Sequence, residues 1–297
     1  MGRGLLGTHR GLRTLIASLS AELFKLRRRP GVWILGVILV ALLVVLGYLV
    51  SWLVLSHPPR GAQFPPHYDP SAAKVALYPQ NLVRSTFGGG GSILGGAICM
   101  ILGVIAVGSE YGWGTFKTLM TQRPGRIPTF IGRLLAVAIV VVIFDLAVFA
   151  AAILTSLILV SIDGQPLVWP AAATVLEGMA ATWLAYFVWA SFGMLLAYLF
   201  KQSALAIGIG LIYMLLIEGL AINLLLPLGD WVKELQRGLP GPAMTALGGA
   251  FGKAYQPAGA VVTQPLMDGT RATITLIVYV LVFSGIAGLL IQQRDVT

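Results

Sequence analysis

The stretch EYGWGTFKTLMTQRPGRIPTFIGR, residues 110–133, is the only long polar interruption in the middle of an otherwise apolar chain. It carries five charged residues, Glu110, Lys117, Arg123, Arg126 and Arg133. The segments on its two sides each run for more than twenty residues with at most one charge. Because charged side chains are costly inside a membrane, a segment of this kind has to lie in water. The stretch therefore divides the chain into membrane-spanning parts.

The composition places the chain among membrane proteins. Hydrophobic residues make up 57% of its 297 residues and charged residues 10%, with a mean hydropathy of +0.87. Soluble domains average about 25% charged residues. The hydrophobic residues form runs of about twenty or more, enough to cross the hydrocarbon core as helices, whose backbone groups are satisfied internally. We therefore predict an all-α integral membrane protein, with residues 1–297 forming a single transmembrane domain.

Six apolar runs predict six transmembrane helices. They cover residues 32–55, 88–109, 134–160, 171–200, 203–226 and 272–291. The last two runs are separated by residues 227–271, a long segment rich in glycine and proline that we expect on the extracytoplasmic side. The middle of this segment, PAMTALGGAFG (242–252), is apolar but too short to span, which indicates a re-entrant or interfacial piece.

Residues 11–29 predict an amphipathic helix at the membrane surface. Leucine and isoleucine recur at helical spacing on one side of it, opposite Ser18, Glu22 and Lys25. Its flanks are basic, as in helices that lie in the headgroup plane. The alternative is a targeting peptide. However, the apolar run that follows, 32–55, is long and has no A-x-A-like end, so we expect it to be a retained span.

The distribution of lysine and arginine predicts which side of the membrane each segment faces. With both termini inside, the inner segments hold 13 of the 20 Lys/Arg residues: seven before the first span, four in 110–133, Lys201 and Arg294. The outer segments hold the other seven in a greater length of chain. The positive-inside rule therefore favours an N-in/C-in orientation. Residues 110–133 then face the cytoplasm, where ATP is available.

The sequence contains no arrangement of residues that predicts catalysis. It has no Ser/His/Asp grouping, no H-E-x-x-H and no phosphate-binding G-x-x-x-x-G-K-[ST] sequence. Its one cysteine, Cys99, excludes an intramolecular disulfide, and its three histidines are scattered over loops and tail. We predict that the chain is not an enzyme by itself, with no catalytic residue, metal ligand or cofactor of its own.

The polar stretch combines apolar and charged side chains in a way that suits docking. Trp113, Phe116 and Leu119 are apolar anchors, and Pro124 with Gly125 would end a short helix that contains them. An aromatic knob with a charged rim is what the groove of a partner protein binds. The residues alone leave a second interpretation open, an ordinary charged loop between spans.

EYGWGTFKTLMTQRPGR (110–126) resembles the cytoplasmic loop of ABC-type exporter permeases of the second type. In that loop a glutamate is followed by Gly-Thr, leucine, proline and arginine, and the matching residues here are Glu110, Gly114, Thr115, Leu119, Pro124 and Arg126. AELFKLRRRPGVWIL (21–35) is similar to the family's sequence before the first span, and the matching residues are Glu22, Lys25, Arg29 and Pro30. The closing QQRDVT is similar to a common family ending.

The resemblance implies a permease subunit that works with two copies of a separate cytoplasmic ATPase, which would bind ATP and magnesium. It implies a homodimer or pseudo-symmetric heterodimer in the cell membrane of a prokaryote. The net charge of +9 does not indicate a nucleic-acid partner, because lysine and arginine that flank membrane spans set topology. It also implies which residues of the coupling segment 110–133 contact the ATPase: Glu110, Tyr111, Trp113, Gly114, Thr115, Phe116, Lys117, Leu119, Pro124 and Arg126. In the interfacial helix, the residues implied to transmit motion are Glu22, Lys25, Arg28 and Arg29.

Two acidic residues, Asp145 and Glu218, lie inside predicted spans. Acids there are costly and usually face protein or water, so both are candidates for a substrate pathway. The alternative is that they link helices through hydrogen bonds. These acids also motivate a second function, an ion-coupled secondary transporter, although no internal repeat supports it. A third is a non-transporting scaffold or sensor subunit. For an exporter, the apolar surfaces favour a hydrophobic or amphipathic substrate.

Overall fold

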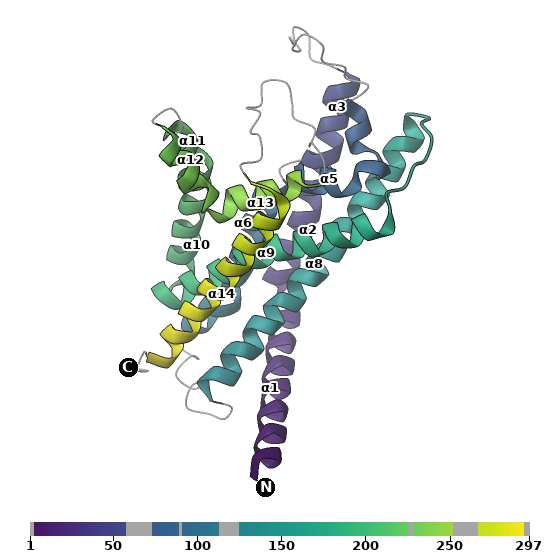
Figure 1. The fold of residues 1–297 in the computed structure, drawn as a ribbon. Coiled ribbons are helices and arrows are strands. Elements are labelled where there is room, and N and C mark those ends of the chain that lie inside the picture. Colours follow the sequence, from purple (N-terminus) through teal and green to yellow (C-terminus); the bar gives the residue numbers. More distant parts are fainter. Residues whose placement is uncertain are drawn as a thin grey trace.

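The computed structural model describes residues 3–57, 73–88, 91–112, 125–225, 229–251 and 267–293. Within these ranges the chain is helical and contains no strand, which confirms the predicted all-α class. By length and composition, five of the described helices can cross a membrane (Figure 1). They are Pro30–Ser56, Ile93–Tyr111, Arg126–Ile162, Ala172–Phe200 and Gly269–Gln293.

The first of these spans is one continuous rod with a change of helix type in its middle. It consists of α2 (Pro30–Leu42), the π-helical η1 (Leu43–Val50) and α3 (Ser51–Ser56). Pro30 stands at the start of α2, where a proline is tolerated because the first backbone N–H groups of a helix have no partner within it. Within η1, Tyr48 is buried, and its hydroxyl lies 2.7 Å from Ser85 Oγ on α5 (Leu82–Gly88).

The other long spans are α6 (Gly91–Gly112), α8 (Arg126–Ile162), α9 (Ala172–Phe200) and α14 (Gly269–Gln293). The bounds of two of these helices differ from the prediction at the coupling segment. Helix α6 continues to Gly112 and α8 begins at Arg126, so both ends of the predicted coupling segment 110–133 are helical. These helix ends can contain charged residues because Glu110 and Arg133 are buried as an ion pair.

The predicted span 203–226 is a helix of mixed type, made of α10 (Ser203–Leu211), the π-helical η4 (Ile212–Ala221) and α11 (Ile222–Leu225). Its apolar part, Ser203–Glu218, is shorter than the other five candidates. The count of six spans and the N-in/C-in orientation therefore stay predictions. In Figure 1, α1 and the end of α14 both lie at the lower end of the bundle.

With the N-terminus inside, the predicted spans leave three segments outside the cytoplasm, and short helices occupy two of them, 56–87 and 227–271. The first contains η2 (Val75–Leu77), η3 (Pro79–Asn81) and α5, and the second contains α12 (Asp230–Arg237) and α13 (Pro240–Gly249). Helix α13 includes most of the apolar piece noted in the sequence and starts earlier, at a proline. It packs against α14 and α5, and its re-entrant character stays a prediction.

Helices α6 and α9 form the centre of the bundle. In the most apolar 18-residue stretch of each, 67% of the residues are buried, compared with 22% for the first span and for α14. The two central helices approach closely because Gly103 on α6 faces Ala190 on α9, and Gly193 on α9 faces Met100 on α6. Small residues at such contacts let backbones meet, as is common between membrane helices.

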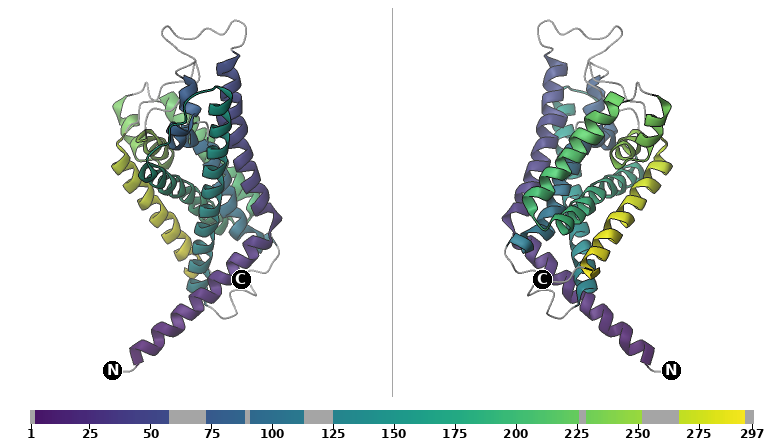
Figure 2. Two further views of the ribbon diagram at one scale, coloured as in Figure 1. Left: turned by 90° about the vertical axis from the view of Figure 1, so that its right-hand side faces the viewer. Right: turned by 90° about the vertical axis from the view of Figure 1, so that its left-hand side faces the viewer.

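Helix α1 (Arg3–Arg28) leaves the bundle at an angle (Figure 2). It is longer than the predicted helix at 11–29. A helix lying in the headgroup plane would turn its polar side to water, yet Ser18 and Glu22 are buried, 5% and 4% exposed, against α8. Ile16 and Phe24 are instead exposed. The polar side of α1 therefore packs against protein, because α6 and α8 supply partners for its charges.

Candidate functional site

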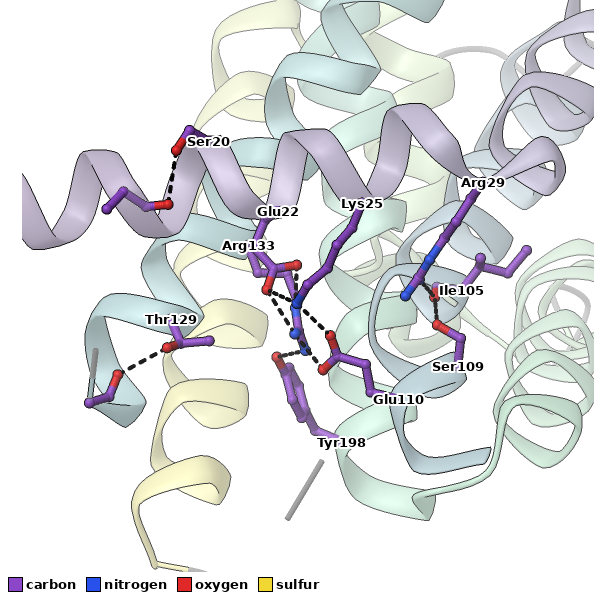
Figure 3. A network of polar contacts seen from close by, with 12 residues as sticks. Ser20, Glu22, Lys25, Arg29, Ile105, Ser109, Glu110, Thr129, Arg133 and Tyr198 are labelled. Atoms are coloured by element: carbon purple, nitrogen blue, oxygen red, sulfur yellow. Dashed lines mark hydrogen bonds and ion pairs between the residues drawn. The ribbon is translucent and has the colours of Figure 1, made fainter. Parts of the chain in front are cut away.

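A network of charged side chains joins four helices near the start of α8 (Figure 3). At its centre is Arg133 of α8. Its Nε donates to Glu22 Oε2 on α1 at 3.3 Å, and its Nη2 donates to Glu22 Oε1 at 3.1 Å. The same Nη2 also bonds Glu110 Oε2 at the end of α6, and Nη1 donates to the hydroxyl of Tyr198 on α9 at 3.2 Å. One guanidinium thus contacts three other helices.

Lys25 completes the network from the α1 side. Its Nζ lies 3.0 Å from Glu22 Oε1 and 3.1 Å from Glu110 Oε1. Two acids and two bases therefore meet, and their formal charges balance. We name Glu22, Lys25, Glu110, Arg133 and Tyr198 the α1 charge network.

Burial makes this pairing energetically important. Arg133 is 1% exposed, Glu110 2% and Glu22 4%, whereas Lys25 is partly exposed. Removing charges from water costs several kcal/mol per ion, which is offset only where geometry is good and the remaining polar atoms are bonded. The guanidinium of Arg133 meets these conditions because it donates hydrogen bonds to two carboxylates and a hydroxyl. The network therefore fixes how α1 sits on the bundle.

Close packing brings α1 to this position. Next to Arg133, a Cβ added at Gly132 would lie 2.8 Å from Ser18 Cβ, so glycine permits the approach of α1 to α8. After α1 ends, Arg29 donates from Nη1 to the carbonyl oxygen of Ile105 on α6 at 2.8 Å. The end of α1 is thus fastened to both helices that border the coupling segment.

The charges of the network lower the pKa of Glu22. Burial alone would raise the pKa of this carboxyl group. The positive charges of Arg133 and Lys25, with the hydrogen bonds that both donate, outweigh burial, and the pKa lies below its ordinary value of 4.5. Glu22 is therefore ionised throughout the physiological range.

This shift predicts a pH dependence of stability. A pKa that is lower in the folded than in the unfolded protein stabilises the fold above the unfolded value, and that stability is lost as pH falls through the folded value. We expect the melting temperature of the purified protein to exceed that of Glu22→Gln by a constant amount from roughly pH 8 to pH 5, and the difference to close in more acidic solution. A difference that has vanished by about pH 6 would contradict the assignment.

The structure places the remaining predicted coupling residues as follows. Tyr111 is half-buried in the last turn of α6 and packs against the core. Arg126 begins α8, and its Nη1 lies 3.4 and 3.2 Å from the carbonyl oxygens of Ile291 and Gln292 at the end of α14. The other predicted residues lie outside the described residues: Trp113, Gly114, Thr115, Phe116, Lys117, Leu119 and Pro124.

Among the interfacial-helix predictions, Arg28 is not brought into the network. Its guanidinium lies 5.2 Å from the ring centroid of Phe24 on the same helix, and the side chain is exposed. Glu22 and Lys25 belong to the network, and Arg29 contacts α6. Three of the four predicted residues thus contact the rest of the bundle.

The two intramembrane acids lie in different surroundings. Asp145 is 3% exposed near Cys99 of α6 and Tyr186 of α9, and its Oδ1 has no hydrogen-bond partner among the described residues. Glu218 on η4 accepts a hydrogen bond at 2.8 Å from the backbone N–H of Gly241, in the first turn of α13. Their described contacts do not make them one site.

Two members of the network, Arg133 and Tyr198, are not among the site residues that the sequence predicts. Arg133 is the last charge of the polar stretch, and its place directly before an apolar run of twenty or more residues is a signal that could indicate a buried partner. Tyr198 has no comparable signal, because a tyrosine near a span end more often lies at the interface. Among the described residues no group of three or more His, Cys, Asp or Glu could hold a metal ion.

The fold and the network together define a class: a multi-pass helical membrane protein whose surface helix is joined by buried charges to the polar segment between two spans. A family model described as "ABC-2 family transporter protein" matches residues 18–217. The chain belongs to this family, which confirms the resemblance seen in the sequence, and the match includes every member of the α1 charge network. A comparison with curated proteins finds no match.

Proposed function

We propose that the chain is the membrane-spanning permease subunit of an ATP-driven exporter. A separate cytoplasmic ATPase supplies the energy, and a hydrophobic or amphipathic substrate is moved outward. The observation that supports this best is the α1 charge network. It joins Glu110 and Arg133, the two ends of the coupling segment, to each other and to Glu22 of α1. A force applied to that segment would therefore act on α1, α6 and α8 together.

The packing of these helices suggests how such a force reaches the membrane part. Helix α6 is in close contact with α9, and α8 also packs on α9. A second link runs through Arg126, which donates to the carbonyl oxygens of Ile291 and Gln292 in the last turn of α14. In the proposed mechanism, ATP favours one of two packed arrangements of these helices, as alternating access requires.

The proposed assembly contains two permease copies, as a homodimer or a pseudo-symmetric heterodimer, and two ATPase copies in a prokaryotic cell membrane. Co-purification with an ATPase that carries a phosphate loop tests this directly. In proteoliposomes, ATP hydrolysis by the complex should drive uptake into inside-out vesicles. Transport by the chain alone along an ion gradient would instead support a secondary transporter, the alternative motivated by Asp145 and Glu218. Binding of an ATPase without any transport would support a scaffold.

Replacing Trp113 or Phe116 with alanine is expected to uncouple ATP hydrolysis from transport. Buried aromatic anchors at protein interfaces contribute about 2 kcal/mol or more, so ATPase affinity should fall at least about thirtyfold. Affinity can be measured by titrating the ATPase onto the permease in nanodiscs. Trp169→Ala is the matched control, since Trp169 is exposed in the connection between α8 and α9. Normal coupled transport by both coupling-segment variants would overturn the assigned role.

A further inference from the structure

Glu218 occupies an unusual position in the second half of the chain. It lies on the π-helical η4, is 6% exposed, and uses Oε2 to accept the bond from Gly241 at the start of α13. Its other oxygen, Oε1, is buried, and the hydroxyl of Tyr213, five residues earlier on η4, lies within reach of the carboxyl group. An acid in a membrane helix is costly unless a partner satisfies it. Among the described residues no lysine or arginine is paired with Glu218, so its negative charge has no positive partner there.

Aromatic side chains form a continuous row beside this carboxylate. The ring of Tyr213, also on η4, lies 5.2 Å from Phe192 and 6.5 Å from Trp189, both on α9. Phe192 in turn lies 5.0 Å from Phe283 on α14, and Phe283 lies 5.2 Å from Tyr279. The row thus connects three helices, α9, η4 and α14.

The row begins and ends near Glu218. In a π-helix, bonded from residue i to i+5, Tyr213 and Glu218 stand on the same face. The carboxylate lies close enough for its charge to act on the hydroxyl groups of Tyr213 and Tyr279. Tyr279 also donates to the carbonyl oxygen of Gly238, just before α13, at 2.7 Å. The two ends of the row are therefore held at the carboxylate by η4, α14 and the start of α13.

We propose that Glu218 and this aromatic row, Trp189, Phe192, Tyr213, Tyr279 and Phe283, bind a hydrophobic organic cation. The carboxylate supplies the opposite charge, and the ring faces supply apolar contact together with cation–π attraction. Phe192, Tyr213, Tyr279 and Phe283 are partly buried, so part of each side chain is exposed, whereas Trp189 is buried behind them. The role of this cation as the transported substrate rests on the proposed exporter function.

The test uses two lipophilic ions of the same shape and opposite charge, tetraphenylphosphonium and tetraphenylborate. The full chain, in nanodiscs of zwitterionic lipid and without any ATPase, is expected to bind tetraphenylphosphonium saturably and tetraphenylborate not at all. Glu218→Gln should weaken binding of the cation by about tenfold or more. Glutamine can still accept the bond from Gly241, so the contact with α13 is kept. Glu177→Gln, which changes an exposed acid on α9, should leave affinity unchanged.

A second variant tests the site independently of the acid. Phe283→Leu removes one ring without altering α13 and should weaken cation binding by about two- to fivefold, as expected for one cation–π contact. Equal binding of both ions, no saturable binding of the cation, or unchanged affinity in both Glu218→Gln and Phe283→Leu would overturn the site. ATP-coupled export without tetraphenylphosphonium binding would reject the site and keep the proposed function. Binding of tetraphenylphosphonium without ATP-coupled export would keep the site and reject the proposed function.

Discussion

Replacing Arg133 with methionine is expected to lower the free energy of unfolding by about 3–5 kcal/mol, the range found when one partner of a buried ion pair is removed. Methionine keeps much of the apolar stem, so the loss comes mainly from charge. Glu22 and Glu110 would remain buried, with Lys25 as the one base left among the residues of the α1 charge network. Thermal unfolding of the purified chain measures the stability. With the ATPase added, the same variant should hydrolyse ATP without transport.

Two comparisons separate the buried charges from a general effect of losing an arginine. Arg28→Met, on the exposed side of α1, should change stability by no more than about 0.5 kcal/mol, as surface substitutions usually do. A triple variant, Arg133→Met with Glu22→Gln and Glu110→Gln, should recover part of the loss because the two buried side chains that lose Arg133 are then neutral. If Arg133→Met were as stable as Arg28→Met, the α1 charge network would not hold α1 on the bundle.

The sequence predicts the helical class and the positions of the long spans because an apolar run that crosses the membrane has to satisfy its backbone hydrogen bonds within a helix. The resemblance also selects Glu22, Lys25 and Glu110. What it does not provide is the pairing of Glu22 with Arg133, which are 111 positions apart. That pairing depends on how each helix is rotated about its axis, and helical spacing alone assigns Glu22 to the water side of α1.

The contacts of the segments between spans do not follow from the sequence for a related reason. Glycine and proline in 227–271 indicate breaks, and they do so correctly at Gly229 and Pro240, where α12 and α13 begin. Which residues meet across these breaks is set by packing. The bond from Gly241 to Glu218 joins two elements that the sequence shows only as a loop and a span. The sequence leaves open whether Glu218 meets a substrate or links helices by hydrogen bonds, and in the structure one of its oxygens is bonded to the first turn of α13.

Adding a single methyl group at Gly103 is expected to destabilise the fold by about 3 kcal/mol, the upper end of the usual range for overpacking. A Cβ there would lie 2.0 Å from the carbonyl oxygen of Ala190, which belongs to backbone and cannot rotate away. Helices α6 and α9 would have to separate in the most buried part of the bundle. Gly285→Ala on α14 is the matched control, because nothing lies within 4 Å of its Cβ position. Its melting temperature should stay the same or rise, since alanine favours a helix by about 1 kcal/mol over glycine.

Gly193 on α9 has equally little room for a side chain, since a Cβ there would lie 2.0 Å from the carbonyl oxygen of Met100 on α6. If both glycines limit one distance between α6 and α9, the separation forced by the first methyl group makes room for the second. The double variant Gly103→Ala/Gly193→Ala should therefore be destabilised by less than the sum of the two single changes, as contacting sites generally couple. Thermal or denaturant unfolding of the four proteins measures this coupling. Strict additivity would mean that the two contacts are independent, and a Gly103→Ala variant as stable as Gly285→Ala would mean that the helices are not in close contact.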